Sequence, residues 1–289
     1  AGPGRLVKWD SPWGEGFPGW HSECSAMSLG ELGERIDLHT GGEDNVFPHH
    51  EDEIAQSEGA SGQPFVRVWL HVKHLLVDGE KMSKSKGNVY TVDDLETQGH
   101  TLPAVRLQLL SAHYRSELNF TTAGLDDARA AIRRLVDFRD RVEVADVETG
   151  DVVDAGRHPL ASAARQGLVR FEAAIADDLD TPAALAALFD FVREANAALD
   201  RQRIVPAGAR AAALDLVARA DRVLGVLELE DQRAAVDPDL ADWVEERIRS
   251  RAEARARRDF DAADAIREEL EEAGVVVEDT PGGARWRRK

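Results

Sequence analysis

The sequence has a single cysteine and few lysines, and each scarcity narrows what the protein can be. Cys24 is the only cysteine among 289 residues, so no disulfide within the chain can stabilise the fold. A lone thiol is either a small buried apolar side chain or a working group. Cys24 is therefore expected either in the hydrophobic core or in a functional site.

Long hydrophobic runs are also missing. No stretch approaches the roughly 20 consecutive apolar residues that a membrane span requires. The first ten residues have neither the basic nor the apolar region of a signal peptide. We expect a soluble, cytoplasmic protein without a membrane partner.

Basic residues are outnumbered by acids, 36 to 54, which gives a formal net charge of −18. Such a field repels nucleic acid and on its face argues against a nucleic-acid partner. The acidic excess is divided between both halves of the chain, which is typical of a solvated coat. An acid-rich, lysine-poor composition resembles proteins of salt-accumulating cells, where charge repulsion is screened within a few ångströms. Acidic drift in a GC-rich genome is the alternative explanation.

Half of the six lysines fall within six positions, in the run Lys81-Met82-Ser83-Lys84-Ser85-Lys86. The run follows an Asp78-Gly79 turn signal, so we expect it on an exposed loop. Ammonium groups and hydroxyls on such a loop can neutralise a polyphosphate. A solvated basic loop is the simpler interpretation, but the clustering of scarce lysines makes it less convincing.

The residue pattern changes near residue 120, and this predicts an α/β part followed by an all-α helical bundle. The first part has strand patterns at 36–39 and within 65–77, and the second has long segments rich in Ala, Leu, Arg and Glu. We expect helices at 49–57, 92–98, 103–114, 125–142, 160–176, 182–199, 207–227 and 239–273, with a short strand at 275–277. Thr181 is expected to cap the helix that starts at Pro182, and 146–158 is expected to be a linker.

Cys24, His49 and Glu53 form a candidate metal site. His49 and Glu53 are four residues apart on an expected helix, so their side chains project from one face. Sulfur, imidazole nitrogen and carboxylate oxygen together suit zinc. A buried cysteine beside a polar helix start is the commoner explanation of such residues. The spacing also fails to distinguish His49 from His50, because His50 and Glu53 are three residues apart on nearly the same face.

Several ordered blocks of sequence resemble the cysteinyl-tRNA synthetases, a family of class I aminoacyl-tRNA synthetases. The blocks are Gly19-Trp20-His21-Ser22-Glu23-Cys24, His39-Thr40-Gly41-Gly42-Glu43-Asp44, Phe47-Pro48-His49-His50-Glu51-Asp52-Glu53 and Lys81-Met82-Ser83-Lys84-Ser85, the KMSKS signature. The resemblance continues through 113–116, 177–182 and 278–286 and covers essentially the whole chain. It implies a Rossmann-type catalytic domain, followed by a helical region that binds tRNA(Cys).

The resemblance also implies roles for individual residues. Zinc would be held by Cys24, His49 and Glu53 and would receive the thiol of the substrate cysteine. Trp20 and His39 would line the amino-acid pocket. The residues implied in binding ATP, with its Mg2+, are Asp44, Lys81, Ser83 and Lys84, and of these Lys81 and Lys84 would be catalytic. The division implied along the chain is 1–79 for the catalytic part with the zinc site, 80–120 for the KMSKS loop and tRNA stem contact, 121–240 for the helical anticodon-binding domain and 241–289 for a small C-terminal region.

The sequence departs from the family at its start. It begins at Ala1 and lacks the N-terminal half of the nucleotide fold, which in the family carries the HIGH signature and a fourth zinc ligand. We therefore expect the chain alone to be nearly inactive in aminoacylation and to bind zinc weakly.

Basic residues of the helical part are candidates for contact with tRNA. Arg129, Arg133, Arg134, Arg139 and Arg141 share one expected helix, and Arg285, Trp286, Arg287, Arg288 and Lys289 form a basic tail. Arginines and an aromatic ring can stack on exposed loop bases. Solvated arginines paired with acids one turn away, such as Asp137 beside Arg133 and Arg141, are the alternative for the helix.

Two other functions remain compatible with the sequence. A ligase that joins cysteine to an amino sugar shares the zinc pocket and a KMSKS-like loop but lacks the full anticodon-binding region. A fragment that only binds tRNA, or that completes a split enzyme, is the second.

Overall fold

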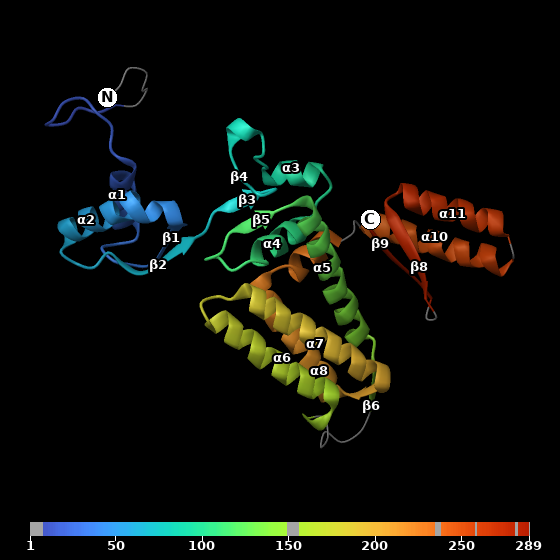
Figure 1. The fold of residues 1–289 in the computed structure, drawn as a ribbon. Helices are drawn as coiled ribbons and strands as arrows, with labels where there is room; N and C mark the ends of the chain where they lie inside the picture. Colours follow the sequence, from blue (N-terminus) through green and yellow to red (C-terminus); the bar gives the residue numbers. More distant parts are fainter. Residues whose placement is uncertain (1–7, 149–155, 235–237, 258, 281–282, 289) are drawn as a thin grey trace.

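The computed structural model describes residues 8–148, 156–234, 238–257, 259–280 and 283–288. An α/β part comes first and a mainly helical part follows it (Figure 1), so the expected change of fold class along the chain is confirmed. Within the described residues, no helix combines the length and apolar character needed to cross a membrane.

The first part is built on two parallel strands, β1 (Ile36–Gly42) and β2 (Val66–Val72), with Ile36 opposite Val66 and Gly42 opposite Val72. Parallel neighbours require a crossover, and α2 (Glu51–Ser61) supplies it and packs on α1 (Trp20–Glu31). The sequence predicted β1 and α2 but not α1. Between β1 and α2 lie two short turns of helix, η1 (Glu43–Asn45) and η2 (Val46–His50), so His49 precedes the α-helix itself.

A second sheet has the order β4-β3-β5, with β3 at Leu75–Val77, β4 at Glu80–Lys81 and β5 at Leu118–Phe120. Asp78 and Gly79 both have positive φ, 50° and 79°, and form the tight turn between β3 and β4 that their sequence predicted. The lysine run begins at the last residue of β4 and includes η3 (Lys84–Lys86). The helices α3 (Val92–Thr97) and α4 (Leu102–Leu110) complete this region.

The expected helix 103–114 is too long, because α4 ends at Leu110. Residues 113–116 instead form a turn closed by the Ser116 N–H, which donates to the His113 carbonyl at 2.8 Å. This turn is held by contacts with residue 178, which is distant in sequence. Helical propensity at 111–114 is therefore overridden by tertiary contacts.

The helical part contains α5 (Thr122–Glu143), α6 (Pro159–Ala176), α7 (Thr181–Arg201), α8 (Ala207–Leu224) and α9 (Leu227–Ala234). These helices share one core, in which the rings of Phe138 and Phe191 meet edge to face at 5.3 Å. Helix α6 runs beside α7 and α8 (Figure 1).

Two expectations in this part are wrong in detail. Asp180, and not Thr181, caps α7, because its carboxylate accepts the Ala183 N–H at 2.9 Å and Thr181 is already helical. The expected linker 146–158 begins with a strand, β6 (Asp146–Glu148), which pairs in parallel with β7 (Ile204–Pro206). Its residues 149–155 lie outside the described residues.

The last part folds around its own small core of Val244, Leu270 and Val275. The helical pattern expected over 239–273 is interrupted, giving α10 (Pro238–Ala256) and α11 (Phe260–Glu272), and Asp259 caps the second helix. The expected strand at 275–277 extends as β8 (Val275–Thr280) and pairs in an antiparallel manner with β9 (Gly283–Arg288). Most of the basic tail is therefore a strand, while Lys289 lies outside the described residues.

Candidate functional site

Cys24, His49 and Glu53 converge between α1, η2 and α2. Their candidate ligand atoms, a sulfur, an imidazole nitrogen and a carboxylate oxygen, all lie within 4.8 Å of one another. Helix α1 carries Cys24, and α2 carries Glu53 just beyond the turn that holds His49. His49 Nε2 is 2.9 Å from Glu53 Oε1. The folded chain thus assembles the ligand set from segments about 25 residues apart in sequence.

Glu53 has no exposed surface at all. Its Oε2 is 2.6 Å from His39 Nε2, within hydrogen-bond distance. Its Oε1 is close enough to His49 to form an ion pair, but the geometry is not that of a hydrogen bond. This oxygen therefore has no hydrogen-bond donor. A buried carboxylate oxygen without a donor is costly, and a cation at this position would remove the cost.

The environment of Cys24 also favours its protonated, uncharged form. Burial raises the pKa of its thiol, and the nearby Glu53 carboxylate raises it further. A divalent cation would stabilise the thiolate and the carboxylate together. The S, N and O donors match the ligands that zinc takes in proteins, and three protein ligands leave a position open. These residues therefore fit a zinc ion.

The neighbouring His50 belongs to a different group. With His39 it forms a second set around Glu53, again within 4.8 Å, and its Nδ1 lies 2.8 Å from His71 Nε2. Burial, followed by the charge of His39, lowers the pKa of His50 to about 4. His50 is thus neutral near pH 7 and faces the β2 side chains, whereas His49 faces Cys24.

Aromatic residues surround the two histidine groups. The Trp20 ring lies 4.1 Å from the His49 ring, and His39 stacks on Trp69 at 4.7 Å. Trp20 is 62% exposed, so it forms an outer wall that a small ligand can reach. Trp69 and His71 were not predicted as site residues from the sequence. They are two positions apart on β2 and so share one face of the strand, next to His39 on β1. This alternation is the sequence pattern that could have indicated them.

Asp44 lies at the carboxyl end of β1, in η1. Its neighbour Glu43 forms an ion pair with Lys73, which directly follows β2, so the ends of both strands are tied together. Ligands of open parallel sheets bind outside the carboxyl ends of the strands. Asp44 is exposed at this edge.

The hairpin that follows β3 carries Lys81, Ser83 and Lys84. This hairpin is separate from the elements that hold the cysteine and histidine cluster (Figure 1). The side chain of Asn88 closes the loop, since its Oδ1 accepts the Ser83 N–H at 2.8 Å and its Nδ2 donates to the Lys81 carbonyl at 3.3 Å. Lys81 is exposed, and the Lys84 side chain lies outside the described side chains. The loop thus has a defined backbone before any ligand binds.

The arginines of α5 mostly contact other elements. Arg141 donates to Asn196 and Asp200 of α7, Arg134 lies over the Phe189 ring at 4.6 Å, and Arg129 donates to the Gly99 carbonyl at 2.7 Å. These partners differ from the expected pairing with an acid one turn away. The contacts position α5 against its neighbours and leave fewer of its arginines available for RNA.

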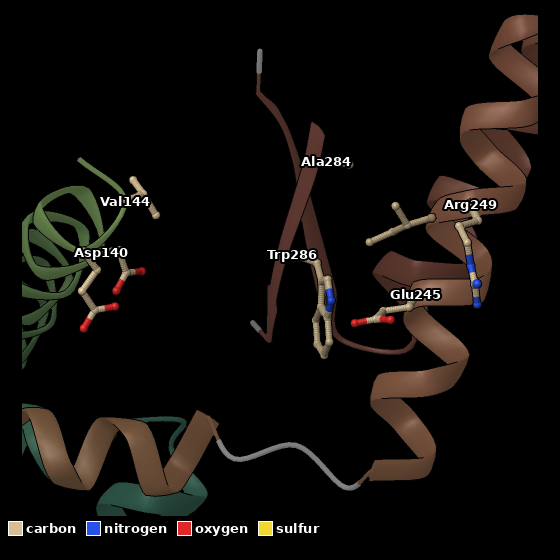
Figure 2. A pocket seen from close by; sticks show the side chains of 8 residues that line it. Asp140, Val144, Glu245, Arg249, Ala284 and Trp286 are labelled. Atoms are coloured by element: carbon tan, nitrogen blue, oxygen red, sulfur yellow. The ribbon is translucent and has the colours of Figure 1, made fainter. Parts of the chain in front are cut away.

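An open cavity of about 670 Å³ lies between the end of α5 and the C-terminal part. Asp140 and Val144 line one side, while Glu245, Arg249 and Trp286 line the other (Figure 2). Trp286 comes from β9, and its ring lies beside Glu245 (Figure 2) and packs against the small core of the C-terminal part.

Comparison with known proteins assigns the chain to a family. Sequence models match over residues 2–130 for the tRNA synthetases class I (C) catalytic domain, 170–228 for the DALR domain and 237–287 for the cysteinyl-tRNA ligase anticodon binding domain. The cysteine–tRNA ligase of Protochlamydia amoebophila is 42% identical over 98% of the chain, and that of Symbiobacterium thermophilum is 44% identical over 97%. The chain belongs to the cysteinyl-tRNA synthetase family. It spans 57% and 58% of the length of these two relatives.

A solved structure shares the fold. The LeuRS chain from a ternary complex with tRNA and LeuAMS, from Agrobacterium radiobacter, matches with a TM-score of 0.54 at 18% identity, over 70% of this chain and 27% of that one. At this identity the likeness concerns the fold alone, and it agrees with the α/β and helical parts described above.

Proposed function

We propose that this chain serves a cysteine–tRNA ligase, which activates cysteine with ATP and transfers it to tRNA(Cys). In the first step the carboxylate of cysteine attacks the α-phosphorus of ATP and pyrophosphate leaves. In the second, the terminal ribose hydroxyl of the tRNA attacks the acyl carbon and AMP leaves. The observation that carries the proposal is the convergence of Cys24, His49 and Glu53 around a buried carboxylate oxygen that lacks a hydrogen-bond donor.

The cluster explains how cysteine would be selected. A zinc ion held by Cys24, His49 and Glu53 would supply a soft position that prefers a thiolate sulfur to the hydroxyl oxygen of serine. Trp20 would cover the small side chain from the solvent side, given its 4.1 Å approach to His49. His39 would hold Glu53 in place through its 2.6 Å contact.

The nucleotide would lie across the carboxyl ends of β1 and β2. Asp44 at that edge is placed to accept hydrogen bonds from the ribose hydroxyls of ATP. Lys81, Ser83 and Lys84 would approach from the neighbouring hairpin, and the two lysines, with Mg2+, would neutralise charge on the phosphates as pyrophosphate leaves.

The helical parts would bind the tRNA. The family match over 237–287 is named for anticodon binding, and Trp286 lies at the cavity of Figure 2 with β9 arginines beside it in sequence. We keep the division 1–79, 80–120, 121–240 and 241–289 as part of this proposal. The same match argues against the amino-sugar ligase, which has no use for an anticodon-binding region. Whether labelled cysteine appears on tRNA or on the amino sugar distinguishes the two.

Zinc binding by the chain itself is the first test. Titration against a chromophoric zinc chelator should show one zinc ion bound per chain, weakly because only three ligands come from this chain. Cys24→Ser should lower the affinity about 100-fold or more, since a thiolate ligand is lost. His100→Ala, which removes a histidine outside the cluster, should leave the affinity unchanged.

Circular dichroism should show the same helix content in all three proteins, so that a loss of zinc is not a loss of folding. Zinc affinity that is unchanged in Cys24→Ser would contradict the proposed site.

Activity is tested separately. The chain should support charging of tRNA(Cys) when the remaining part of a relative's length is added in trans, and it should show little pyrophosphate exchange alone. A mixture that binds tRNA but forms neither adenylate nor charged tRNA would favour the fragment that only binds tRNA.

A further inference from the structure

The turn between α6 and α7 has an unusual backbone. Asp178 and Leu179 are consecutive non-glycine residues with positive φ, 54° and 58°. Side chains with a Cβ adopt this left-handed conformation at a cost in free energy, and such residues persist where surrounding contacts hold them. Here the Leu179 N–H donates to the Ile175 carbonyl at 3.2 Å, and the Asp180 N–H donates to the Ala174 carbonyl at 3.1 Å.

The conformation presents Asp178 to three consecutive residues that are more than 60 positions away in the sequence. Its Oδ1 accepts the Tyr114 hydroxyl at 2.5 Å, and its Oδ2 accepts Arg115 Nε at 2.5 Å. Its main-chain carbonyl lies 3.0 Å from His113 Nε2. We call Asp178 and residues 113–115 the Asp178 latch. The same contacts, Arg115 first and Tyr114 next, lower the pKa of Asp178 to about 2, so the carboxylate is ionised at any physiological pH.

The latch continues to the edge of the first sheet. The Tyr114 carbonyl accepts the Lys73 N–H at 2.8 Å, and Lys73 directly follows β2. The Lys73 ammonium group pairs with Glu43, directly after β1 and beside Asp44. Contacts of Tyr114 and Lys73 therefore connect the α6–α7 turn to the strand ends where the nucleotide is proposed to bind.

Stability alone does not explain this arrangement. The Asp178 side chain is 46% exposed and that of Arg115 is 63% exposed. Ion pairs that face solvent in this way contribute little to folding stability, while the left-handed turn opposes it. The contacts instead specify an orientation, because a carboxylate that accepts from a guanidinium and a phenol admits few relative positions of the two segments.

We propose that Asp178 is a positioning residue that holds the α6–α7 hairpin at a set angle to the carboxyl ends of β1 and β2. This rests on the proposed function, in which the helical part holds tRNA while the sheet edge holds the activated amino acid. Figure 1 shows the turn at the end of the hairpin that faces β5 and α4. The latch would present the tRNA terminus to the acyl group in the transfer step, and it has no part in adenylate formation.

The test compares Asp178→Asn with Asp177→Asn. Asparagine tolerates the left-handed backbone, so the first change weakens the latch without forcing the turn to refold. Asp177 is an exposed acid of the same turn and keeps the charge change equal. Hydrogen exchange of the Lys73 amide is the first measurement. It should become about tenfold faster in Asp178→Asn and stay unchanged in Asp177→Asn, because only the first variant frees residue 114.

The second measurement uses the protein extended to the length of its relatives. In Asp178→Asn, kcat for charging tRNA(Cys) should fall about tenfold or more, since misplacement of reacting groups by an ångström has effects of that size. KM for tRNA and the rate of pyrophosphate exchange should stay within about twofold. Tyr114→Phe, which removes one hydrogen bond of the latch, should show a smaller loss of the same kind.

Each outcome decides the matter. Equal losses in the rates of pyrophosphate exchange and of tRNA charging would overturn the proposal, because they would indicate a general contribution to folding. Identical behaviour of Asp178→Asn and Asp177→Asn would overturn it too. Absence of pyrophosphate exchange in the extended protein without any substitution would count against the proposed function, and the hydrogen-exchange rate of the Lys73 amide would then decide on the latch by itself.

Discussion

At the scale of single residues, the environment gives neighbouring side chains of one type different roles. His49 and His50 are adjacent and both buried, but His49 turns toward Cys24 while His50 contacts His71. Close packing sharpens the difference, because a Cβ added at Gly41 would come within 2.6 Å of the His50 ring. Glycine at this position lets the imidazole lie directly on the β1 backbone.

The two histidines should therefore differ when replaced. His49→Ala removes a proposed ligand and should weaken zinc binding more than about 100-fold, whereas His50→Ala removes a supporting residue and should weaken it about tenfold. Chelator competition at pH 7.5 measures both. Equal losses would contradict the assignment of His49 as the ligand.

At the scale of elements, helix packing in the bundle depends on one small residue. Gly167 lies within α6 where that helix meets α7 and α8, and a Cβ there would be 2.8 Å from Phe191 Cβ and 3.0 Å from Leu216 Cδ1. Neither atom can move away easily, because both belong to the densely packed core. The close approach of the three helices thus requires glycine at position 167.

Gly167→Ala should destabilise the chain by up to about 2 kcal/mol, since overpacking costs about 1–3 kcal/mol and the gain in helix propensity offsets about 1 kcal/mol of it. Urea unfolding followed by circular dichroism measures the change. Gly59→Ala is the matched control, because that helical glycine has no atom within 4 Å of the added Cβ. It should be neutral or slightly stabilising, and a stabilising Gly167→Ala would contradict the packing argument.

At the scale of the whole molecule, charge is the dominant feature. The net charge of −18 sits on a chain whose arginines often contact acids across elements, as Arg219 does with Glu172 and Arg141 with Asp200. The remaining acidic excess repels itself and favours expansion of the chain. A nucleic-acid partner is compatible with such a field where basic groups are gathered locally, as on the β9 sequence.

Salt should consequently stabilise the folded chain. Raising KCl from about 0.1 M to 2 M at pH 7.5 shortens the Debye length to a few ångströms and should raise Tm by about 5 °C or more. The control is the same comparison near pH 4.9, the isoelectric point, where the increase should largely disappear. A Tm that falls with KCl at pH 7.5 would contradict the argument that repulsion within the acidic excess destabilises the folded chain.

The sequence alone determined the order of fold classes, the helices with strong periodicity and the motifs that identify the family. These depend on local patterns: apolar spacing, turn residues such as Asp78-Gly79, and short blocks of chemically distinctive side chains. Short strands such as β5 and β6 were not predictable, because three residues have no periodicity and owe their strand conformation to a partner distant in sequence.

Only the tertiary structure decided which side chains meet. It placed His49 rather than His50 beside Cys24, left Glu53 Oε1 without a donor, and ended α4 early so that Tyr114 and Arg115 reach Asp178. Tyr114 and Asp178, for example, are 64 positions apart in the sequence. Local propensity carries no information about them, because they form only when the packing of several elements fixes the distance between their side chains.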